Sequence, residues 1–439
     1  VNLDLAVTGS QTVVSGLTLR LSSVTGIEDV TGTAFADTVR GNTRDNVLSG
    51  LAGADTLVGR TGDDTFIGSA GDDSFDGGIG TDTVIESADI DFTLAPTTLT
   101  GLGTDTLASI ERANLTAGAS ANTFTVQGWT GVATLTGLTG NDRYVFSGTE
   151  SASVTIVEGA DADTDTLDFT ALANGGVSLD LAATTAQSLV AGLTLTLSTA
   201  TGIENVTGTA FADSVQGNAR DNTLTGLAGD DTLSGRLGND SFDGGAGTDT
   251  TAETADVDFT LAATTLTGVG NDTLTGIETV NLAAGAGHNT FTVDGWTGNA
   301  SLTGGAGNDS YVFTGTASAN VTIVESADID TDLLDFTTLA NGGVSLDLAV
   351  TTAQTVSAGL TLTLSTATGL ENVTGTALAD TLLGNARANV LSGLGEDDTL
   401  SGRDGNDTFD GGTGSDVVTE SADVDFTLAA ATLAGVGSD

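Results

Sequence analysis

Residues 32–85 read GTAFADTVR, GNTRDNVLS, GLAGADTLV, GRTGDDTFI, GSAGDDSFD and GGIGTDTVI, six consecutive nonapeptides that each begin with glycine. The sixth place holds an acid or its amide, namely Asp37, Asn46, Asp55, Asp64, Asp73 and Asp82. The eighth place holds an apolar residue, namely Val39, Leu48, Leu57, Phe66, Phe75 and Val84. A fixed period with one apolar side chain per unit is typical of stacked repeats, because each unit buries its apolar side only against its neighbours.

The chain also repeats on a longer scale. The segment at 176–213 returns almost unchanged at 343–380, a shift of 167 residues. We therefore divide the chain into module 1 (1–176, six nonapeptides at 32–85), module 2 (177–343, five at 208–252) and a partial module 3 (344–439, five at 375–419). Because module 3 stops in mid-repeat, we expect this sequence to be a stretch of a longer repetitive polypeptide. Module 1 has one unit more than module 2, and the sequence leaves open how nine extra residues fit a coil built from two units.

Composition excludes several classes of protein. There are 59 acids against 10 basic residues, giving a formal net charge of −49, so nucleic acid is not an expected partner. With no Cys and one His, disulfide scaffolds, zinc fingers and His clusters are excluded. No apolar run reaches the roughly 18 residues that indicate a membrane span. Hydrophobic residues make up 38% of the chain, too many for a merely solvated acidic polymer.

Each nonapeptide is interpreted as a tight turn followed by a short strand. Glycines suit positions with positive φ or close backbone approach, and the following Asp-x-apolar-x segment points one apolar side chain inward. Stacked coils would form a continuous apolar column, with backbone hydrogen bonds along the stack. Between the blocks, alternation around Phe92 and Leu94, and around Phe259 and Leu261, predicts half-buried strands. The sequence thus predicts an all-β parallel β-solenoid with less regular β segments between the nonapeptide blocks.

The units GGIGTDTV at 77–84 and GGAGNDSY at 304–311 fit the pattern GGxGxDxUx, where U is a large apolar residue. In this the chain resembles the RTX, or haemolysin-type, calcium-binding nonapeptide repeat family, and sixteen units in tandem blocks carry the resemblance. The resemblance implies a right-handed parallel β-roll with two nonapeptides per coil and several Ca²⁺ ions held between turns on the same side. Calcium accepts six to eight oxygen ligands, so rows of Asp carboxylates suit it.

We predict the calcium ligands among the sixth-place acids. Units that keep the glycine pattern give Asp55, Asp64, Asp73, Asp82, Asp231, Asp240, Asp249, Asp398, Asp407 and Asp416, although Glu396 takes a glycine place near Asp398. Less regular candidates are Asp37, Asp213 and Asp380 in the first unit of each block, and Asp142 and Asp309 in isolated units that need ligands from a neighbouring coil. The first unit of each block carries Phe35, Phe211 or Leu378 at the fourth place instead of glycine. The second unit carries arginine there (Arg44, Arg220 and Arg387) and asparagine at the sixth place. We expect units of both kinds to be poor calcium loops, and in the second kind we expect the arginine to pair with neighbouring carboxylates.

The other chemistry-bearing residues suit a structural role. The only histidine, His288, aligns with Ala121 of module 1, so it is interpreted as a loop residue and not as a catalytic one. Trp129 and Trp296 could form a sugar-stacking platform, but filling of a wider core is favoured. We therefore expect no enzyme activity.

The sequence favours a calcium-stabilised extracellular structural protein, a component of a filament, sheath or surface layer that associates with itself. The alternative is the stalk of an RTX adhesin or toxin-like secreted protein whose active domain lies elsewhere. A contact with a cell surface or polysaccharide fits either. The resemblance implies a location outside the cell or on its surface, reached by type I secretion from a Gram-negative bacterium.

Overall fold

The computed structural model of the chain describes residues 1–149, 151–420, 427–428 and 433–434, so most of the end of module 3 lies outside the described residues. The described residues form short strands and no helix. They fall into two units, Val1–Gly229 and Asp230–Asp439, which are treated separately below. Among the described residues, no helix is long and apolar enough to cross a membrane.

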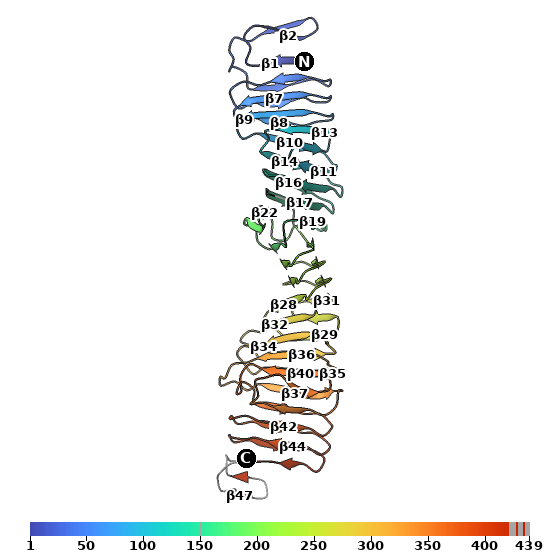
Figure 1. The fold of residues 1–439 in the computed structure, drawn as a ribbon, viewed down its shortest axis with the longest axis vertical. Helices are drawn as coiled ribbons and strands as arrows, with labels where there is room; N and C mark the ends of the chain where they lie inside the picture. The colour runs from blue at the N-terminus through green and yellow to red at the C-terminus, as the bar shows by residue number, and fades with distance from the viewer. Residues whose placement is uncertain (150, 421–426, 429–432, 435–439) are drawn as a thin grey trace. The chain divides into compact units, whose positions relative to one another are not determined.

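In the first unit, parallel strands stack into two walls that face each other (Figure 1). The long wall contains β1 (Asn2–Asp4), β5 (Thr38–Arg40), β7 (Thr56–Thr61), β9 (Ser74–Ile79), β13 (Thr104–Ala108), β12 (Thr98–Thr100), β11 (Phe92–Ala95), β15 (Thr123–Gln127), β17 (Arg143–Gly148), β19 (Thr166–Leu172), β23 (Asn205–Thr207) and β25 (Thr223–Thr225). Strand β12 is antiparallel to both of its neighbours, so β11–β13 form an inserted meander.

The opposite wall of the first unit is made of separate sheets. Its main sheet contains β4 (Asp29–Thr31), β6 (Val47–Ser49), β8 (Thr65–Ile67), β10 (Thr83–Ser87), β14 (Arg112–Thr116), β16 (Val132–Leu138), β18 (Ser153–Glu158), β22 (Leu193–Leu197) and β21 (Gln187–Val190). A second sheet begins with β20 (Ser178–Asp180) and β24 (Ser214–Gln216). Near the N-terminus, β2 (Ser10–Val14) and β3 (Leu17–Arg20) form a separate antiparallel hairpin.

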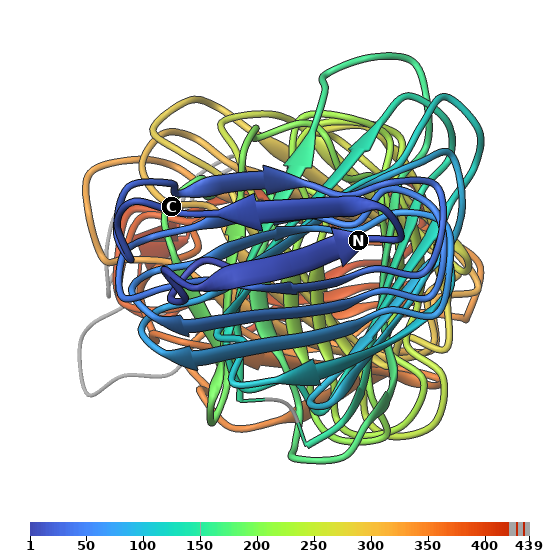
Figure 2. The same cartoon turned by 90° about the horizontal axis from the view of Figure 1, so that it is seen from above.

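The strand register shows that one coil contains two nonapeptides. On the long wall Val39 pairs with Leu57, and Leu57 pairs with Phe75. On the opposite wall Leu48 pairs with Phe66. Each step is 18 residues, and these apolar side chains are fully buried between the walls. Figure 2 looks along this stack: the blue N-terminal strands run from side to side, and loops connect them at both sides. The predicted all-β parallel β-roll is therefore confirmed.

The second unit has the same two-walled construction. One wall contains β27 (Ser241–Asp243), β29 (Phe259–Ala262), β30 (Thr265–Thr267), β31 (Asn271–Thr275), β33 (Thr290–Asp294), β35 (Ser310–Gly315), β37 (Leu333–Leu339), β41 (Asn372–Thr374), β43 (Val390–Ser392) and β45 (Thr408–Asp410). The other contains β26 (Thr232–Ser234), β28 (Thr250–Thr254), β32 (Thr279–Ala283), β34 (Asn299–Thr303), β36 (Asn320–Val324), β40 (Leu360–Leu364) and β39 (Gln354–Ser357). It continues as a second sheet of β38 (Ser345–Asp347), β42 (Thr381–Leu383), β44 (Thr399–Ser401) and β46 (Val417–Val418), and β47 (Thr427–Leu428) pairs with β48 (Leu433–Ala434).

Between the nonapeptide blocks the coils widen and large aromatic side chains fill them. The ring of Phe124 stacks on Phe92 at 5.7 Å and on Tyr144 at 5.2 Å, measured between ring centroids. Trp129 is 2% exposed and Trp296 is 3% exposed. The interpretation of these aromatics as core residues is confirmed, because buried rings cannot serve as a sugar-stacking surface.

The extra nonapeptide of module 1 is accommodated by an exchange of walls. Strand β5, in the first unit of the module 1 block, lies on the long wall, whereas its counterpart β24 in the module 2 block lies on the opposite wall. Likewise β4 lies on the opposite wall and its counterpart β23 on the long wall. The strands of both walls have the same Asp-x-apolar pattern. A given nonapeptide can therefore lie on either wall, and the column of buried apolar side chains stays continuous.

A strained residue in module 3 provides a test of the turn geometry. Glu396 takes the fourth, glycine place of its unit with a φ of 65°. Since this left-handed conformation costs a residue with a Cβ about 1–2 kcal/mol, Glu396→Gly should raise the free energy of unfolding by about 1 kcal/mol. Denaturant unfolding of the calcium-loaded chain would measure the change. Glu396→Ala removes the same charge but keeps the Cβ, and an equal gain there would mean that charge, and not φ, is responsible.

Candidate metal centre

The glycines of each nonapeptide make room for the neighbouring coil and for a carboxylate. Gly53 and Gly62, in the fourth place, have φ values of 126° and 119°, and a Cβ on Gly53 would lie 2.6 Å from the carbonyl carbon of Phe35 in the preceding coil. In the first place, a Cβ on Gly50 would lie 1.9 Å from Oδ2 of Asp55. The fourth-place glycine thus permits close stacking, and the first-place glycine leaves space for the carboxylate.

Hydrogen bonds connect the sixth-place aspartates of successive coils into rows that we call carboxylate ladders. The backbone N–H of Asp37 donates to Oδ1 of Asp55 at 2.7 Å, and that of Asp55 donates to Oδ1 of Asp73 at 2.8 Å. On the opposite wall the N–H of Asp64 donates to Oδ1 of Asp82 at 2.7 Å. The same contact joins Asp231 to Asp249, Asp380 to Asp398, Asn389 to Asp407 and Asp398 to Asp416.

The second oxygen of several ladder carboxylates is buried without a hydrogen-bond donor. This holds for Oδ2 of Asp55, Asp64, Asp82, Asp249 and Asp398. A buried carboxylate with an unpartnered oxygen needs a proton or a cation to offset its lost hydration. Hard divalent cations such as calcium take oxygen ligands from carboxylates and turn carbonyls. The glycine-lined ladders therefore fit calcium, with these Oδ2 atoms as donors.

Burial and mutual repulsion raise the pKa values of several ladder carboxylates, Asp64 and Asp73 among them. Burial raises the pKa of Asp64 to about 6, against the hydrogen bond from Asn46, and the neighbouring Asp82, Asp45 and Asp63 add to the rise. Burial likewise raises the pKa of Asp73 to about 6. Without a cation these two carboxylates thus retain protons more readily than free aspartate does.

A second row of acids lies outside the first, at the fifth place of the units. The N–H of Asp63 donates to Oδ1 of Asp45 and the N–H of Thr81 donates to Oδ1 of Asp63, both at 2.8 Å. These carboxylates are exposed or half-buried, in contrast to the buried sixth-place row. The turns therefore carry two rows of carboxylates: a buried row at the sixth place and an exposed row at the fifth place.

The asparagine and arginine of each block's second unit are satisfied by the protein itself. The amide oxygen of Asn46 accepts the N–H of Asn42 at 2.8 Å, and its Nδ2 donates to the carbonyl of Glu28 at 3.0 Å. Arg44 pairs with the carboxylate of Glu28 at 2.9 Å. Arg220 pairs with Glu204 at 3.0 Å and Arg387 with Glu371 at 2.8 Å. The predicted pairing of these arginines with carboxylates is thus confirmed.

The first-unit aspartates differ from the regular ladder members. Asp380 accepts the N–H of Val344 on Oδ1 and the N–H of Thr376 on Oδ2, both at 2.6 Å. Asp213 makes the same two contacts at 2.6 Å in module 2. Asp37 accepts the N–H of Thr33 on Oδ2. Backbone donors thus occupy both oxygens of Asp213 and Asp380 and one oxygen of Asp37, which leaves Asp213 and Asp380 less capacity for a cation than Asp64 or Asp82.

The remaining sequence-predicted ligands lie in three settings. Asp231, Asp240 and Asp407 are buried at ladder positions. Asp416 is also joined to its ladder but is exposed, at the last described strand of that wall. Asp142 and Asp309 are each buried beside a glutamate and a second aspartate from neighbouring strands.

Acids outside the nonapeptide blocks extend the ladders, and the nonapeptide pattern did not reveal them. The N–H of Asp82 donates to Oε2 of Glu111 at 2.9 Å, and the N–H of Asp165 donates to Oε2 of Glu204 at 3.0 Å. In module 2 and beyond, Glu278 and Glu371 have the same role. All lie two residues before an inward apolar residue, so the simpler pattern acid-x-apolar would have found them.

Comparison with known protein families agrees with this geometry. Residues 31–65, 50–84, 216–251, 374–408 and 383–418 match the family described as RTX calcium-binding nonapeptide repeat. The matched segments lie over the three blocks that carry the regular ladders. Comparison with curated proteins gave no significant match.

Proposed function

We propose, from the RTX calcium-binding nonapeptide repeats that the chain carries in all three blocks, that it is a calcium-stabilised structural protein of the cell exterior. Within this role it would form part of a filament, sheath or surface layer. The observation that carries the proposal is the ladder of buried carboxylates with unpartnered oxygens, repeated from coil to coil. Bound calcium would supply the positive charge that these carboxylates lack, and so make folding depend on the ion.

The proposed location follows from the same repeats. RTX repeats are typical of proteins secreted by Gram-negative bacteria. A chain that folds only at the calcium concentrations typical of extracellular modules would remain unfolded in the cytoplasm, as type I export requires. We propose export by this route and a position outside the cell or on its surface.

A structural role, and not catalysis, is proposed for the region described. The lone histidine, His288, is exposed and its Nδ1 accepts the N–H of Asn308. Adjacent acids such as Asp63 and Asp64 belong to the outer and inner carboxylate rows, which supports a role in the turns and in metal binding.

A strand pairing joins each module to the one before it. Strand β3 pairs with β2, whereas its counterparts β22 and β40 also pair with β18 and β36. Leu17 and Leu19 on β3 are 54% and 37% exposed, whereas the equivalent Leu193 and Leu195 on β22 are at most 1% exposed. In modules 2 and 3 this edge is thus covered by a strand of the preceding module of the same chain.

Assembly is tested on the calcium-loaded wild-type chain. With calcium, the wild-type chain should form ordered oligomers or filaments in sedimentation and electron microscopy. A folded wild-type chain that stays monomeric in calcium would instead favour the stalk of an adhesin or toxin-like protein.

A further inference from the structure

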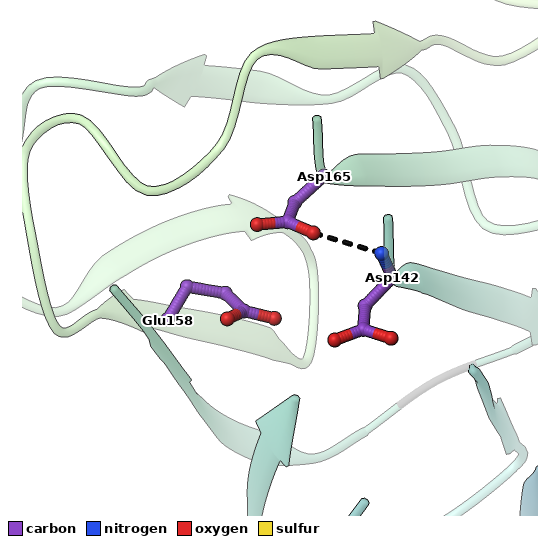
Figure 3. A group of neighbouring side chains, drawn as sticks. All are labelled: Asp142, Glu158 and Asp165. Atoms are coloured by element: carbon purple, nitrogen blue, oxygen red, sulfur yellow. Dashed lines mark hydrogen bonds between the residues drawn. The ribbon is translucent and has the colours of Figure 1, made fainter. Parts of the chain in front are cut away.

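Three buried carboxylates meet in module 1 beyond its nonapeptide block. Asp142 precedes β17, Glu158 ends β18 and Asp165 precedes β19. We call them the module 1 triad, and one oxygen from each lies within 4.8 Å of the others. Figure 3 shows the three side chains turned toward a common space, with Asp165 bound to the backbone N–H of Asp142. The ends of three separate strands therefore meet in one acidic cluster.

Only some of the oxygen atoms of these three carboxylates accept a hydrogen bond from the protein. The N–H of Asn122 donates to Oδ1 of Asp142 at 2.7 Å, and the N–H of Asp142 donates to Oδ1 of Asp165 at 2.8 Å. The hydroxyl of Tyr144 donates to Oε1 of Glu158. Oδ2 of Asp142 and Oε2 of Glu158 have no hydrogen-bond partner, although these residues are only 1% and 6% exposed. Two buried oxygens are thus left for a ligand.

The space in front of these oxygens is kept open by a glycine. A Cβ on Gly137 would lie 2.0 Å from Oε1 of Glu158, 2.3 Å from Oδ2 of Asp142 and 2.6 Å from the hydroxyl of Tyr144. Any larger residue at this position would fill the space on which the oxygens converge.

The same arrangement recurs 167 residues later. Asp309, Glu325 and Asp332 form the module 2 triad, again within 4.8 Å of one another. The hydroxyl of Tyr311 donates to Glu325 at 2.5 Å, and Oδ2 of Asp309 is unpartnered. A Cβ on Gly304 would lie 2.0 Å from Oε1 of Glu325 and 2.5 Å from Oδ2 of Asp309. The repetition shows that the cluster is a regular feature of the module.

We propose that each triad binds one calcium-sized divalent cation. Oxygens that surround one such ion at 2.3–2.6 Å lie at most about 5 Å apart, which the triad satisfies. Three carboxylates without nitrogen or sulfur donors favour a hard cation over zinc or copper. The inference rests on the calcium dependence proposed above, but the site lies outside the segments that match the RTX repeat. To Asp142 and Asp309, which the isolated nonapeptides already predict as ligands, it adds a glutamate and a second aspartate from the ends of two other strands.

The two tyrosines of the chain make this site observable. Tyr144 and Tyr311 are its only tyrosines, and each is bonded to a triad glutamate. Terbium, a hard ion that substitutes for calcium, emits when a nearby tyrosine transfers its excitation energy. The wild-type chain should therefore show tyrosine-sensitised terbium emission that calcium competes away. The double substitution Glu158→Gln with Glu325→Gln should weaken terbium affinity at these sites by at least about tenfold.

Two further variants separate this site from the ladders. Tyr144→Phe with Tyr311→Phe should lose the sensitised emission but keep the calcium stoichiometry measured by calorimetry, because the carboxylates remain. Asp64→Asn should lower calcium binding by the block and leave the emission unchanged. Folded Glu158→Gln, Glu325→Gln protein with wild-type emission and calcium stoichiometry would overturn the proposal and leave protons as the triad's counter-ions. Neither result depends on whether the chain assembles, so this proposal and the assembly proposal can fail separately.

Discussion

Removal of calcium with excess chelator at neutral pH is expected to abolish most of the β-strand circular dichroism signal of the chain, and calcium at millimolar concentration should restore it. A buried ion without a counter-charge costs several kcal/mol, whereas the whole stability of a domain is about 5–15 kcal/mol. The cost of burying the charged carboxylates of Asp55, Asp64 and Asp82, whose Oδ2 atoms have no partner, would thus be as large as the whole free energy of unfolding of a coil stack.

A neutralised ladder is the matched control for this experiment. The substitutions Asp55→Asn, Asp64→Asn and Asp82→Asn keep the shape of the side chains but remove three buried charges. In chelator, this variant should retain more β signal than wild type, and its signal should respond less to calcium. A wild-type chain that keeps its full signal in chelator would contradict the calcium dependence on which the proposed function rests.

Acid should partly replace calcium in the chelated chain. The pKa values of Asp64 and Asp73 are raised to about 6 in the folded chain, from about 3.9 in an unfolded one. Groups of this kind contribute stability that is fully present below about pH 4 and is lost as the pH rises through about 6. Glu253, whose pKa burial raises to about 7, extends the loss toward neutral pH. We therefore expect the chelated chain to gain β signal and melting temperature between pH 7 and pH 4.

The sign of this dependence reverses for the calcium-loaded chain, because protons compete with the ion for the same oxygens. Calcium affinity measured by calorimetry should therefore fall over the same range. Asp64→Asn with Asp73→Asn should flatten the acid response of the chelated chain. A chelated wild-type chain that becomes less stable from pH 7 to pH 5 would show that buried carboxylates do not control its folding.

Much of the fold could be predicted from the sequence because the nonapeptide encodes its own geometry. Leu57 and Phe75 recur at 18-residue steps, and the register pairs them directly. The block aspartates likewise lie in the rows expected for them, as Asp64 and Asp82 do. A strictly local repeat predicts its structure well, since each coil meets only near copies of itself.

The nonapeptide pattern was less informative about acids in the irregular segments and about side chains that strands distant in the sequence bring together. Glu111 and Glu204 join the ladders although they are glutamates in irregular segments, since the requirement is an acid two residues before an inward apolar side chain. Glu158 was missed because it ends a strand of the opposite wall and approaches Asp142 only through the three-dimensional stack. The satisfied oxygens of Asp213 were equally hidden, since Val177 reaches it from 36 residues away.

The exchange of walls caused by the extra nonapeptide has a consequence for how such genes can vary. Tandem repeats readily gain or lose copies, and here a single copy leaves the core intact because β5 and β24 fit either wall. Whether a block has an odd or an even number of units then decides on which wall of the coil stack the strands that precede the block lie. The hairpins and turns attached to those strands change sides with them. Recombination between repeats could therefore present a new outer surface to the surroundings while the interior, and the stability it provides, stays the same.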